Sequence, residues 1–130
     1  MKFLWSTLKV KNMKESLSFY EEVLGLKVTR RFQAGPGMEI AFLGEGETQI
    51  ELIEEKEKKD LTPGQDISWG FQVESLDEMR KLLSKKGIQI LEGPYSPNPF
   101  TAFLYIKDPS GMKIQLVEIK EHGEGEEERP

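Results

Sequence analysis

The stretch Thr48-Gln-Ile-Glu-Leu-Ile53 returns later in the chain as Met112-Lys-Ile-Gln-Leu-Val117. Glu51 and Gln115 hold the same place in the two stretches and are 64 positions apart. Trp5 and Trp69, the two tryptophans of the chain, have the same spacing. This recurrence predicts that one half of the chain is a structural copy of the other.

Each half reads as a strand, a helix and three further strands. Alternating apolar and polar residues indicate half-buried strands, and Asn12 and Ser75 are typical caps at the start of a helix. Gly25 and Gly87 are placed to end the two helices. The predicted strands are 3–10, 26–32, 38–43 and 48–53 in the first half, and 67–73, 88–91, 101–106 and 112–119 in the second.

The length and composition favour a single domain made of both halves. The chain has 130 residues, of which 37% are apolar, and this is enough for one ordinary core but not for two. We expect one domain over residues 1–119, with module one at 1–56, a charged linker at 57–66 and module two at 67–119. Residues 120–130 form an acidic stretch that we expect to be disordered.

Composition also excludes several classes of protein. The chain has no cysteine, so it has neither a disulfide framework nor a thiolate metal site. No apolar run approaches the roughly 20 residues that cross a bilayer. The net charge of −5, without a basic stripe, disfavours nucleic acid and anionic membranes as partners. The sequence therefore predicts a cytoplasmic protein that binds neither nucleic acid nor membrane.

Two further motifs carry a family resemblance. Phe19-Tyr-Glu-Glu-Val-Leu-Gly-Leu26 closes the first predicted helix, and Asp108-Pro-Ser-Gly-Met-Lys-Ile-Gln115 leads into the last strand. With the duplicated βαβββ order, they resemble the vicinal oxygen chelate superfamily of glyoxalase I, bleomycin-resistance proteins and extradiol dioxygenases. The resemblance implies an α+β fold in which two βαβββ modules form an open eight-stranded cup. It also implies a small organic ligand inside the cup and a symmetric homodimer.

The metal-dependent members of this superfamily hold an ion with two histidines and two glutamates. The matching positions here are Trp5, Glu51, Trp69 and Gln115. An indole has a donor N–H but no lone pair for a metal, and an amide is a weaker ligand than a carboxylate. The single histidine, His122, lies in the acidic stretch, outside the matched strands. We therefore expect no metal ion and no cofactor.

The four matched residues suggest a different kind of site. Indole faces attract cations and flat rings, so Trp5 and Trp69 could stack on a planar or cationic compound while Glu51 and Gln115 form hydrogen bonds to it. The alternative is that both indoles only fill apolar space. Glu51 has two interpretations as well. Desolvation among indoles would favour the neutral form of its carboxyl group, so that Glu51 could act as a general acid or base. Alternatively, Glu51 is ionised and paired with a Lys, Arg or amide, or it faces solvent at the mouth of the cup.

Three classes of function stay open at this point. The first is a metal-independent binding protein of the bleomycin-resistance type, and the second is a lyase or isomerase related to glyoxalase I that uses Glu51 or a displaced metal site. The third is an interaction module that keeps only the fold. We expect the segment 94–100 to be a stiff connector, the alternative being a loop at the rim of the cup that covers the ligand with Tyr95 and Phe100. The polar strand residues expected at the surface, away from the site, are Arg30, Arg31, Gln49, Lys113 and Tyr105.

Overall fold

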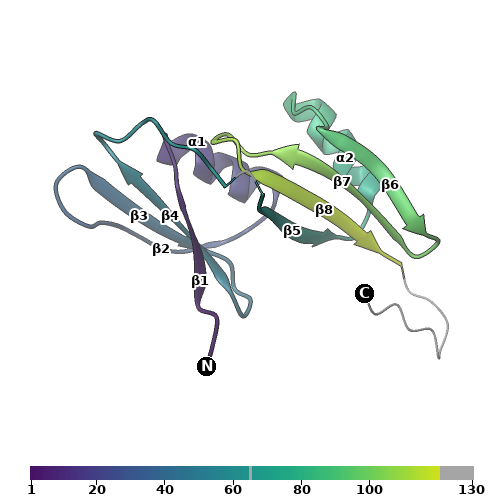
Figure 1. The fold of residues 1–130 in the computed structure, drawn as a ribbon, viewed down its shortest axis with the longest axis horizontal. Helices are drawn as coiled ribbons and strands as arrows, with labels where there is room; N and C mark the ends of the chain where they lie inside the picture. The colour runs from purple at the N-terminus through teal and green to yellow at the C-terminus, as the bar shows by residue number, and fades with distance from the viewer. Residues whose placement is uncertain (65, 121–130) are drawn as a thin grey trace. The chain divides into compact units, whose positions relative to one another are not determined.

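The computed structural model describes residues 1–64 and 66–120 (Figure 1). The predicted acidic tail, with His122, lies outside the described residues apart from Lys120. The strands are β1 (Trp5–Lys9), β2 (Val28–Gln33), β3 (Met38–Leu43), β4 (Gln49–Glu55), β5 (Ser68–Val73), β6 (Glu92–Asn98), β7 (Thr101–Lys107) and β8 (Lys113–Ile119). The helices are α1 (Met13–Ser18), a π-helical turn at Phe19–Val23 and α2 (Leu76–Lys86). No helix among these residues is long and apolar enough to cross a membrane.

The chain folds into two compact units, each with one four-stranded sheet and one helical region. The first unit comprises Met1–Ile67 together with Lys107–Met112, and the second comprises Ser68–Ile106 and the residues from Lys113 onward. The strand orders are β1-β4-β3-β2 and β5-β8-β7-β6, and the first strand of each unit runs parallel to its last. These two βαβββ sheets confirm the predicted α+β fold. Their closure into one cup within a single domain stays a prediction.

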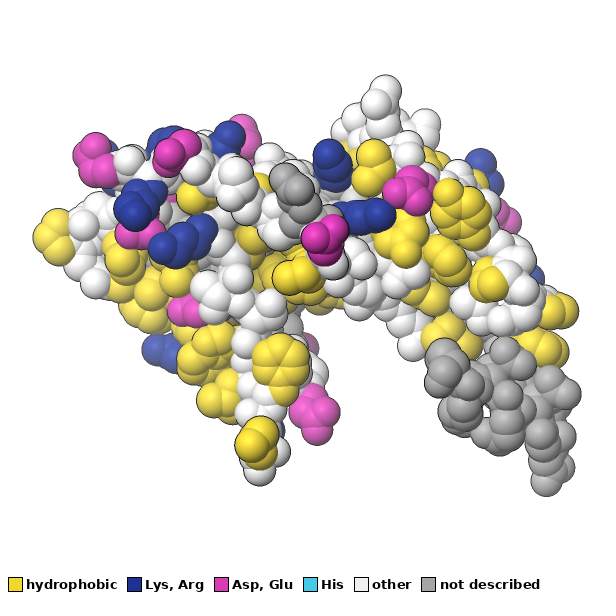
Figure 2. Space-filling view, viewed as in Figure 1, with side chains coloured by type: hydrophobic (Ala, Val, Ile, Leu, Met, Phe, Trp, Pro, Cys, Tyr) yellow, Lys and Arg dark blue, Asp and Glu magenta, His cyan; other side chains and the backbone are white. Residues whose placement is uncertain are grey.

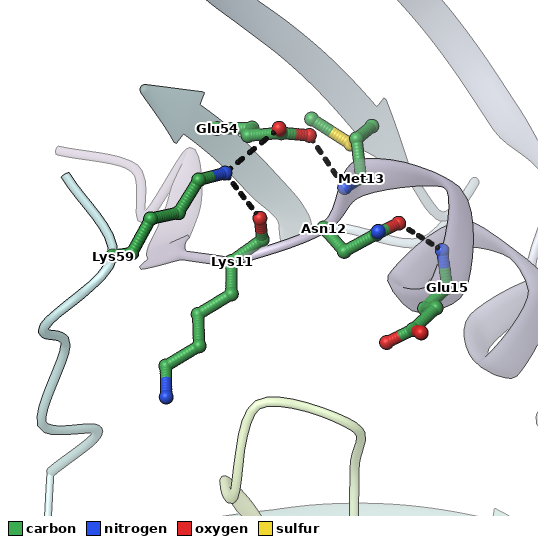
Figure 3. A network of polar contacts seen from close by, with 6 residues as sticks. All are labelled: Lys11, Asn12, Met13, Glu15, Glu54 and Lys59. Carbon is green, nitrogen blue, oxygen red and sulfur yellow. Dashed lines mark hydrogen bonds and ion pairs between the residues drawn. The ribbon is translucent and has the colours of Figure 1, made fainter. Parts of the chain in front are cut away.

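Helix α1 begins at a network of polar contacts around Asn12 (Figure 3). The Asn12 Oδ1 atom accepts the Glu15 N–H at 2.9 Å, and a Glu54 carboxylate oxygen accepts the Met13 N–H at 2.6 Å. The Lys59 ammonium donates to the other Glu54 oxygen at 3.0 Å. These partners satisfy N–H groups that a helix start leaves without an intrahelical acceptor. Glu54 thereby ties the last strand of the unit to its helix.

Helix α2 begins in the same way in the second unit. The Ser75 hydroxyl accepts the Glu78 N–H at 3.1 Å, and Glu118 accepts the Leu76 N–H at 2.7 Å. The predicted caps Asn12 and Ser75 are confirmed, and so is Gly87, which ends α2 with a positive φ of 73°. The first helix differs from the prediction because its second half is π-helical, with the Leu24 N–H bonded to the Phe19 carbonyl at 3.3 Å.

Each unit buries apolar residues between its helix and one face of its sheet. The fully buried residues of the first unit include Val10, Met13, Leu43 and Leu52. Those of the second include Leu83, Leu104, Ile106, Ile114 and Leu116. In the first unit the buried Tyr20 hydroxyl also donates to Asp108 Oδ2 at 2.6 Å. Burial, together with the neighbouring Asp108 carboxylate, raises the pKa of Tyr20 far above its ordinary value.

The predicted strand over 88–91 and the predicted connector over 94–100 are wrong. Strand β6 instead covers Glu92–Asn98 and includes Pro94 and Pro97. It lies at the edge of its sheet, where a proline can avoid the side that needs an N–H donor. Its pairing with β7 shifts register between Glu92 and Tyr95 and again between Tyr95 and Asn98. The prolines that suggested a connector are therefore features of an edge strand.

Candidate functional site

One face of the first unit's sheet carries two of the four predicted site residues, Trp5 and Glu51. Across the four strands Arg30 pairs with Phe42, Phe42 with Glu51, and Glu51 with Thr7. Paired residues of neighbouring strands share a sheet face, so these four side chains form one row. Trp5 lies two residues before Thr7 on β1 and therefore shares this face, here called the first open face. Helix α1 packs on the opposite face.

Aromatic and cationic groups crowd the first open face. Trp5 and Phe42 meet edge to face with ring centroids 5.1 Å apart. The Arg30 guanidinium lies 5.0 Å from the centre of the Phe42 ring and 5.0 Å from that of Phe32. Phe42 is only 4% exposed, whereas Trp5 is 42% exposed. Figure 2 shows hydrophobic side chains at the surface in the region where Figure 1 places β1.

Glu51 is held in place by its neighbour on β1. The Thr7 hydroxyl donates a hydrogen bond of 2.6 Å to a Glu51 carboxylate oxygen. Glu51 is half-buried, so its carboxylate can still be reached from this face. A carboxylate accepts several hydrogen bonds, which leaves room for a donor from a ligand. Glu51 can act chemically as a counter-charge, a hydrogen-bond acceptor or a base.

The second unit offers a different set on the equivalent face. Gln115 pairs with Gly70, and a Cβ atom placed on Gly70 would lie 3.1 Å from the Gln115 Oε1 atom. The Gln115 amide donates to the Tyr105 hydroxyl at 3.3 Å, and the Lys113 ammonium lies 4.3 Å from the centre of the Tyr105 ring. Lys113 also forms an ion pair with Glu92 at 3.0 Å. This second open face is thus built from an amide, tyrosine and an already paired lysine.

The register of β5 and β8 separates Trp69 from Gln115. Trp69 pairs with Ile114, whereas Gly70 pairs with Gln115. Because alternate residues of a strand face opposite ways, Trp69 shares the face of the buried Ile114 and Leu116, which α2 covers. The expectation that Trp69 faces the same space as Gln115 is therefore wrong.

Ser68, not Trp69, is the structural counterpart of Trp5. Trp5 pairs with Gln49, which is two residues before Glu51. Ser68 pairs with Lys113, which is two residues before Gln115. The sequence held a signal for this correction, because the helix caps Asn12 and Ser75 are 63 positions apart rather than 64. Equivalent residues of the two units are 63 positions apart in the first strand and the helix. They are 64 positions apart in the last strand, where Glu54 and Glu118 are equivalent.

Comparisons with known proteins agree with this architecture. The model of the glyoxalase/bleomycin resistance protein/dioxygenase superfamily matches residues 2–116. The chain belongs to this superfamily. The lactoylglutathione lyase of Neisseria meningitidis is 30% identical over 129 residues, covering 92% of each chain. The lactoylglutathione lyase of Salmonella typhimurium is 28% identical, covering 96% of this chain and 98% of the relative.

Solved structures show the same fold. The trypanothione-dependent glyoxalase I of Leishmania major has a TM-score of 0.76 at 25% identity, covering 91% of this chain and 86% of that enzyme. An antibiotic-binding protein from Streptomyces has a TM-score of 0.71 at 17% identity, covering 92% of this chain and 97% of that one. The second likeness is one of fold alone.

The residues at the superfamily's metal positions do not suit a divalent ion. Trp5 has no lone pair to donate, and Ser68, which takes the place of the second histidine, offers only a neutral hydroxyl. Gln115 replaces a carboxylate with an amide that also contacts Tyr105. Among residues 1–64 and 66–120, no three side chains of His, Cys, Asp or Glu type gather closely enough to hold a metal. Glu51 remains as the single strong ligand of the four.

Arg30 and Phe42 are site candidates that sequence reasoning missed. The sequence predicts Arg30 at the surface, away from the site, and gives no signal that Phe42 belongs to it. The structure places Arg30, Gln49, Lys113 and Tyr105 on the open faces, and Arg31 on the opposite one. The alternation along β2 already separates Arg30 from Arg31, but only the pairing with β3 shows which of the two faces the site.

Proposed function

We propose that this superfamily member binds a planar organic compound, without a metal ion, on the first open face. The observation that carries the proposal is the replacement of a metal-binding histidine by the half-exposed Trp5, set against Phe42 and near Glu51. A flat ring stacks on indole and gains about 0.5–1.5 kcal/mol beyond the apolar area that it buries. A donor or cationic substituent on the ring would pair with Glu51.

The second open face offers a separate hydrogen-bonding position on its own unit. Gln115 keeps an amide beside the Tyr105 ring, and Gly70 leaves the space next to it without a side chain. A ligand group there could accept from or donate to the amide. We assign Gln115 a hydrogen-bonding role on its own face, and we drop Trp69 from the proposed binding residues.

A lyase is the second candidate, because the two relatives compared above are lactoylglutathione lyases. In this version Glu51 is the general base, and the Thr7 hydroxyl holds its carboxylate in one orientation. A base must reach the proton that it removes, and a fixed, half-buried carboxylate meets that requirement. Turnover yielding lactoylglutathione that is lost in Glu51→Gln, with ligand binding retained, would favour the lyase over the binding protein.

Tryptophan fluorescence offers a direct test of the binding proposal. A planar ligand on the first open face should quench the emission of Trp5 and leave that of Trp69 unchanged. Saturable quenching is therefore expected in the wild type and in Trp69→Phe, but not in Trp5→Phe. Trp69→Phe is the matched control, because it removes the other indole, which lies on the helix-covered face of the second unit's sheet. Quenching that survives in Trp5→Phe and disappears in Trp69→Phe would refute the proposed site.

Metal independence has its own measurement. Untagged protein purified without chelator should contain far less than one divalent ion per chain by plasma emission analysis. Addition of zinc or nickel should not raise the melting temperature, because a native-state ligand with real affinity would do so. Stoichiometric zinc or nickel in the purified protein would contradict this part of the proposal.

We also propose that the protein is a cytoplasmic homodimer. Both sheets end in edge strands, β1 and β2 in the first unit and β5 and β6 in the second, and unpaired edges invite association. Apolar side chains such as Phe3, Leu4 and Ile119 are exposed in the single chain. Light scattering should give twice the chain mass of 14.9 kDa, and a monomer at micromolar concentration would rule the dimer out.

A further inference from the structure

The Arg30 side chain lies on the first open face, beside two aromatic rings. Its guanidinium lies on two rings, at 5.0 Å from the centres of Phe32 and Phe42. Within the described part of the chain Arg30 takes part in no ion pair, whereas four other basic residues of the first unit lie beside a glutamate. Those paired residues are Lys9, Lys27, Arg31 and Lys59. Arg30 is therefore a cation held against aromatic rings that no acidic side chain of residues 1–64 and 66–120 pairs with.

The planar shape of the guanidinium decides what Arg30 can bind. The ring contacts are made through the cationic centre of the group, and its five N–H donors stay available in the guanidinium plane. That planar set of donors matches a carboxylate, which can accept two parallel hydrogen bonds. Because the rings already limit the motion of the side chain, little further freedom is lost when an acid binds. An exposed lysine without such rings would lack this advantage.

The charges of Arg30 and Glu51 determine which end of a ligand lies at which end of the first open face. Arg30 is on β2 and Glu51 is on β4, so one strand separates them and their backbones are about 10 Å apart. An acid group is repelled by Glu51 and attracted by Arg30. The ring of the ligand would then lie toward Trp5, which touches the same Phe42 ring as Arg30 does. One flat molecule with an acid at one end satisfies both contacts.

We propose that the ligand of the first open face is a planar organic acid whose carboxylate pairs with Arg30 and whose ring stacks on Trp5. This inference rests on the proposed binding function and narrows its ligand class. It adds Arg30 as the residue that determines specificity. A basic or donating substituent at the far end of the same molecule would meet Glu51.

Two probes that differ only in charge test this inference. Naphthalene carboxylate and the matching naphthalene carboxamide have the same ring, and their affinities can be measured by calorimetry or ligand-observed NMR at low salt. The wild type should bind the acid about tenfold more tightly than the amide, as expected for one charge-assisted pair at a partly exposed site. The difference should shrink as salt is added.

Variants of two adjacent arginines provide the control. Arg30→Gln should bind both probes equally, and Arg30→Lys should keep only part of the preference because it retains the charge but not the planar fork. Arg31→Gln removes the neighbouring arginine, which is on the other sheet face beside Glu39, and should keep the full preference. Circular dichroism would confirm that each variant is folded.

The outcomes separate this inference from the proposed function. Equal binding of acid and amide to the wild type would overturn the acid inference and leave the planar-ligand proposal standing. A preference that persists in Arg30→Gln would also overturn it. If neither probe binds and no planar compound quenches Trp5, both proposals fall together.

Discussion

Glu54 of the first unit and Glu118 of the second have the same structural role, because each accepts the first N–H of the helix in its own unit. The Met13 N–H donates to Glu54 at 2.6 Å, and the Leu76 N–H donates to Glu118 at 2.7 Å. The open faces of the same two sheets differ at every candidate position. Trp5, Thr7 and Glu51 in the first unit correspond by register to Ser68, Gly70 and Gln115 in the second. The contacts that hold helix to sheet are thus shared by the two units, and the chemistry on the exposed side is not.

This difference shows where each unit has freedom to change. A helix must satisfy its first N–H groups and bury its apolar side, so the residues that do this are restricted in any copy of the fold. The open face has no such requirement. It can carry an indole and a carboxylate in one unit and an amide and tyrosine in the other without disturbing the core. Six variants test this comparison, in order of expected effect.

Replacing each of the two tryptophans by alanine should give the largest difference in the stability of the protein. Trp69→Ala is expected to lower the free energy of unfolding by about 2–3 kcal/mol, because the indole lies on the face covered by α2. Trp5→Ala is expected to cost about 1 kcal/mol, since Trp5 is 42% exposed. Urea unfolding of both variants gives the comparison. A larger loss for Trp5→Ala would mean that the faces are assigned the wrong way round.

Removal of the Tyr20 hydroxyl should cause the next largest loss in the free energy of unfolding. Its counterpart in the second unit is the apolar Leu83, so this hydrogen bond to Asp108 exists in one unit alone. Tyr20→Phe leaves a buried carboxylate oxygen without its donor and should cost about 2 kcal/mol in chemical denaturation at pH 7.

The pH dependence of the same pair has a definite sign. The pKa of Tyr20 is raised in the folded state, so its contribution is complete below the unfolded value of about 10 and declines as the pH rises above it. The gap between wild type and Tyr20→Phe should therefore not narrow between pH 6 and 9. A loss below half a kcal/mol, or a gap that closes in this range, would contradict the contact.

The two helix-capping glutamates should contribute unequally. Burial alone would raise the pKa of Glu54, but the Met13 N–H and the Lys59 ammonium outweigh it, so the pKa of Glu54 is lowered. Glu54→Gln should cost about 1 kcal/mol at pH 7, and Glu118→Gln somewhat less because no lysine is paired with Glu118 among the described residues.

Acid should remove the effect of Glu54→Gln. A group whose folded pKa is lowered stabilises the protein above its unfolded value, about 4.3 for glutamate, and loses that contribution as the pH falls through the folded pKa. The two proteins should therefore become more alike in stability as the pH falls from the unfolded value through the lower folded pKa. Thermal melts from pH 7 down to pH 3 measure this, and a gap that widens in acid would show that the Glu54 contacts are not as described.

Gly70 should give the smallest effect. A Cβ at this position meets the Gln115 Oε1 atom at 3.1 Å, and this atom is the far end of a flexible side chain. Gly70→Ala should therefore change the free energy of unfolding by less than about 0.5 kcal/mol, because easier strand formation offsets the crowding. A loss above 1 kcal/mol would show that Gln115 cannot move aside.

Local sequence signals predicted the scaffold well, because each depends on a few adjacent residues. The caps Asn12 and Ser75 and the buried alternation of β4 and β8 follow from helix ends and from the two-residue period of a strand. The register between β5 and β8 joins residues more than 40 positions apart, and a shift of one residue reverses the face of a side chain. Trp69 was misplaced for this reason, and β6 was missed because its prolines are acceptable only at an edge.

The contact between Tyr20 and Asp108, 88 residues apart, sets a limit on how the chain can fold during its synthesis. The first unit includes Lys107–Met112, so residues 1–67 leave the ribosome before that segment has been made. Until it is made, the Tyr20 hydroxyl lacks the acceptor that it has when buried. The first unit therefore completes its core only after residues 68–106 of the second have been translated, so its folding cannot finish as soon as its own N-terminal segment has been made.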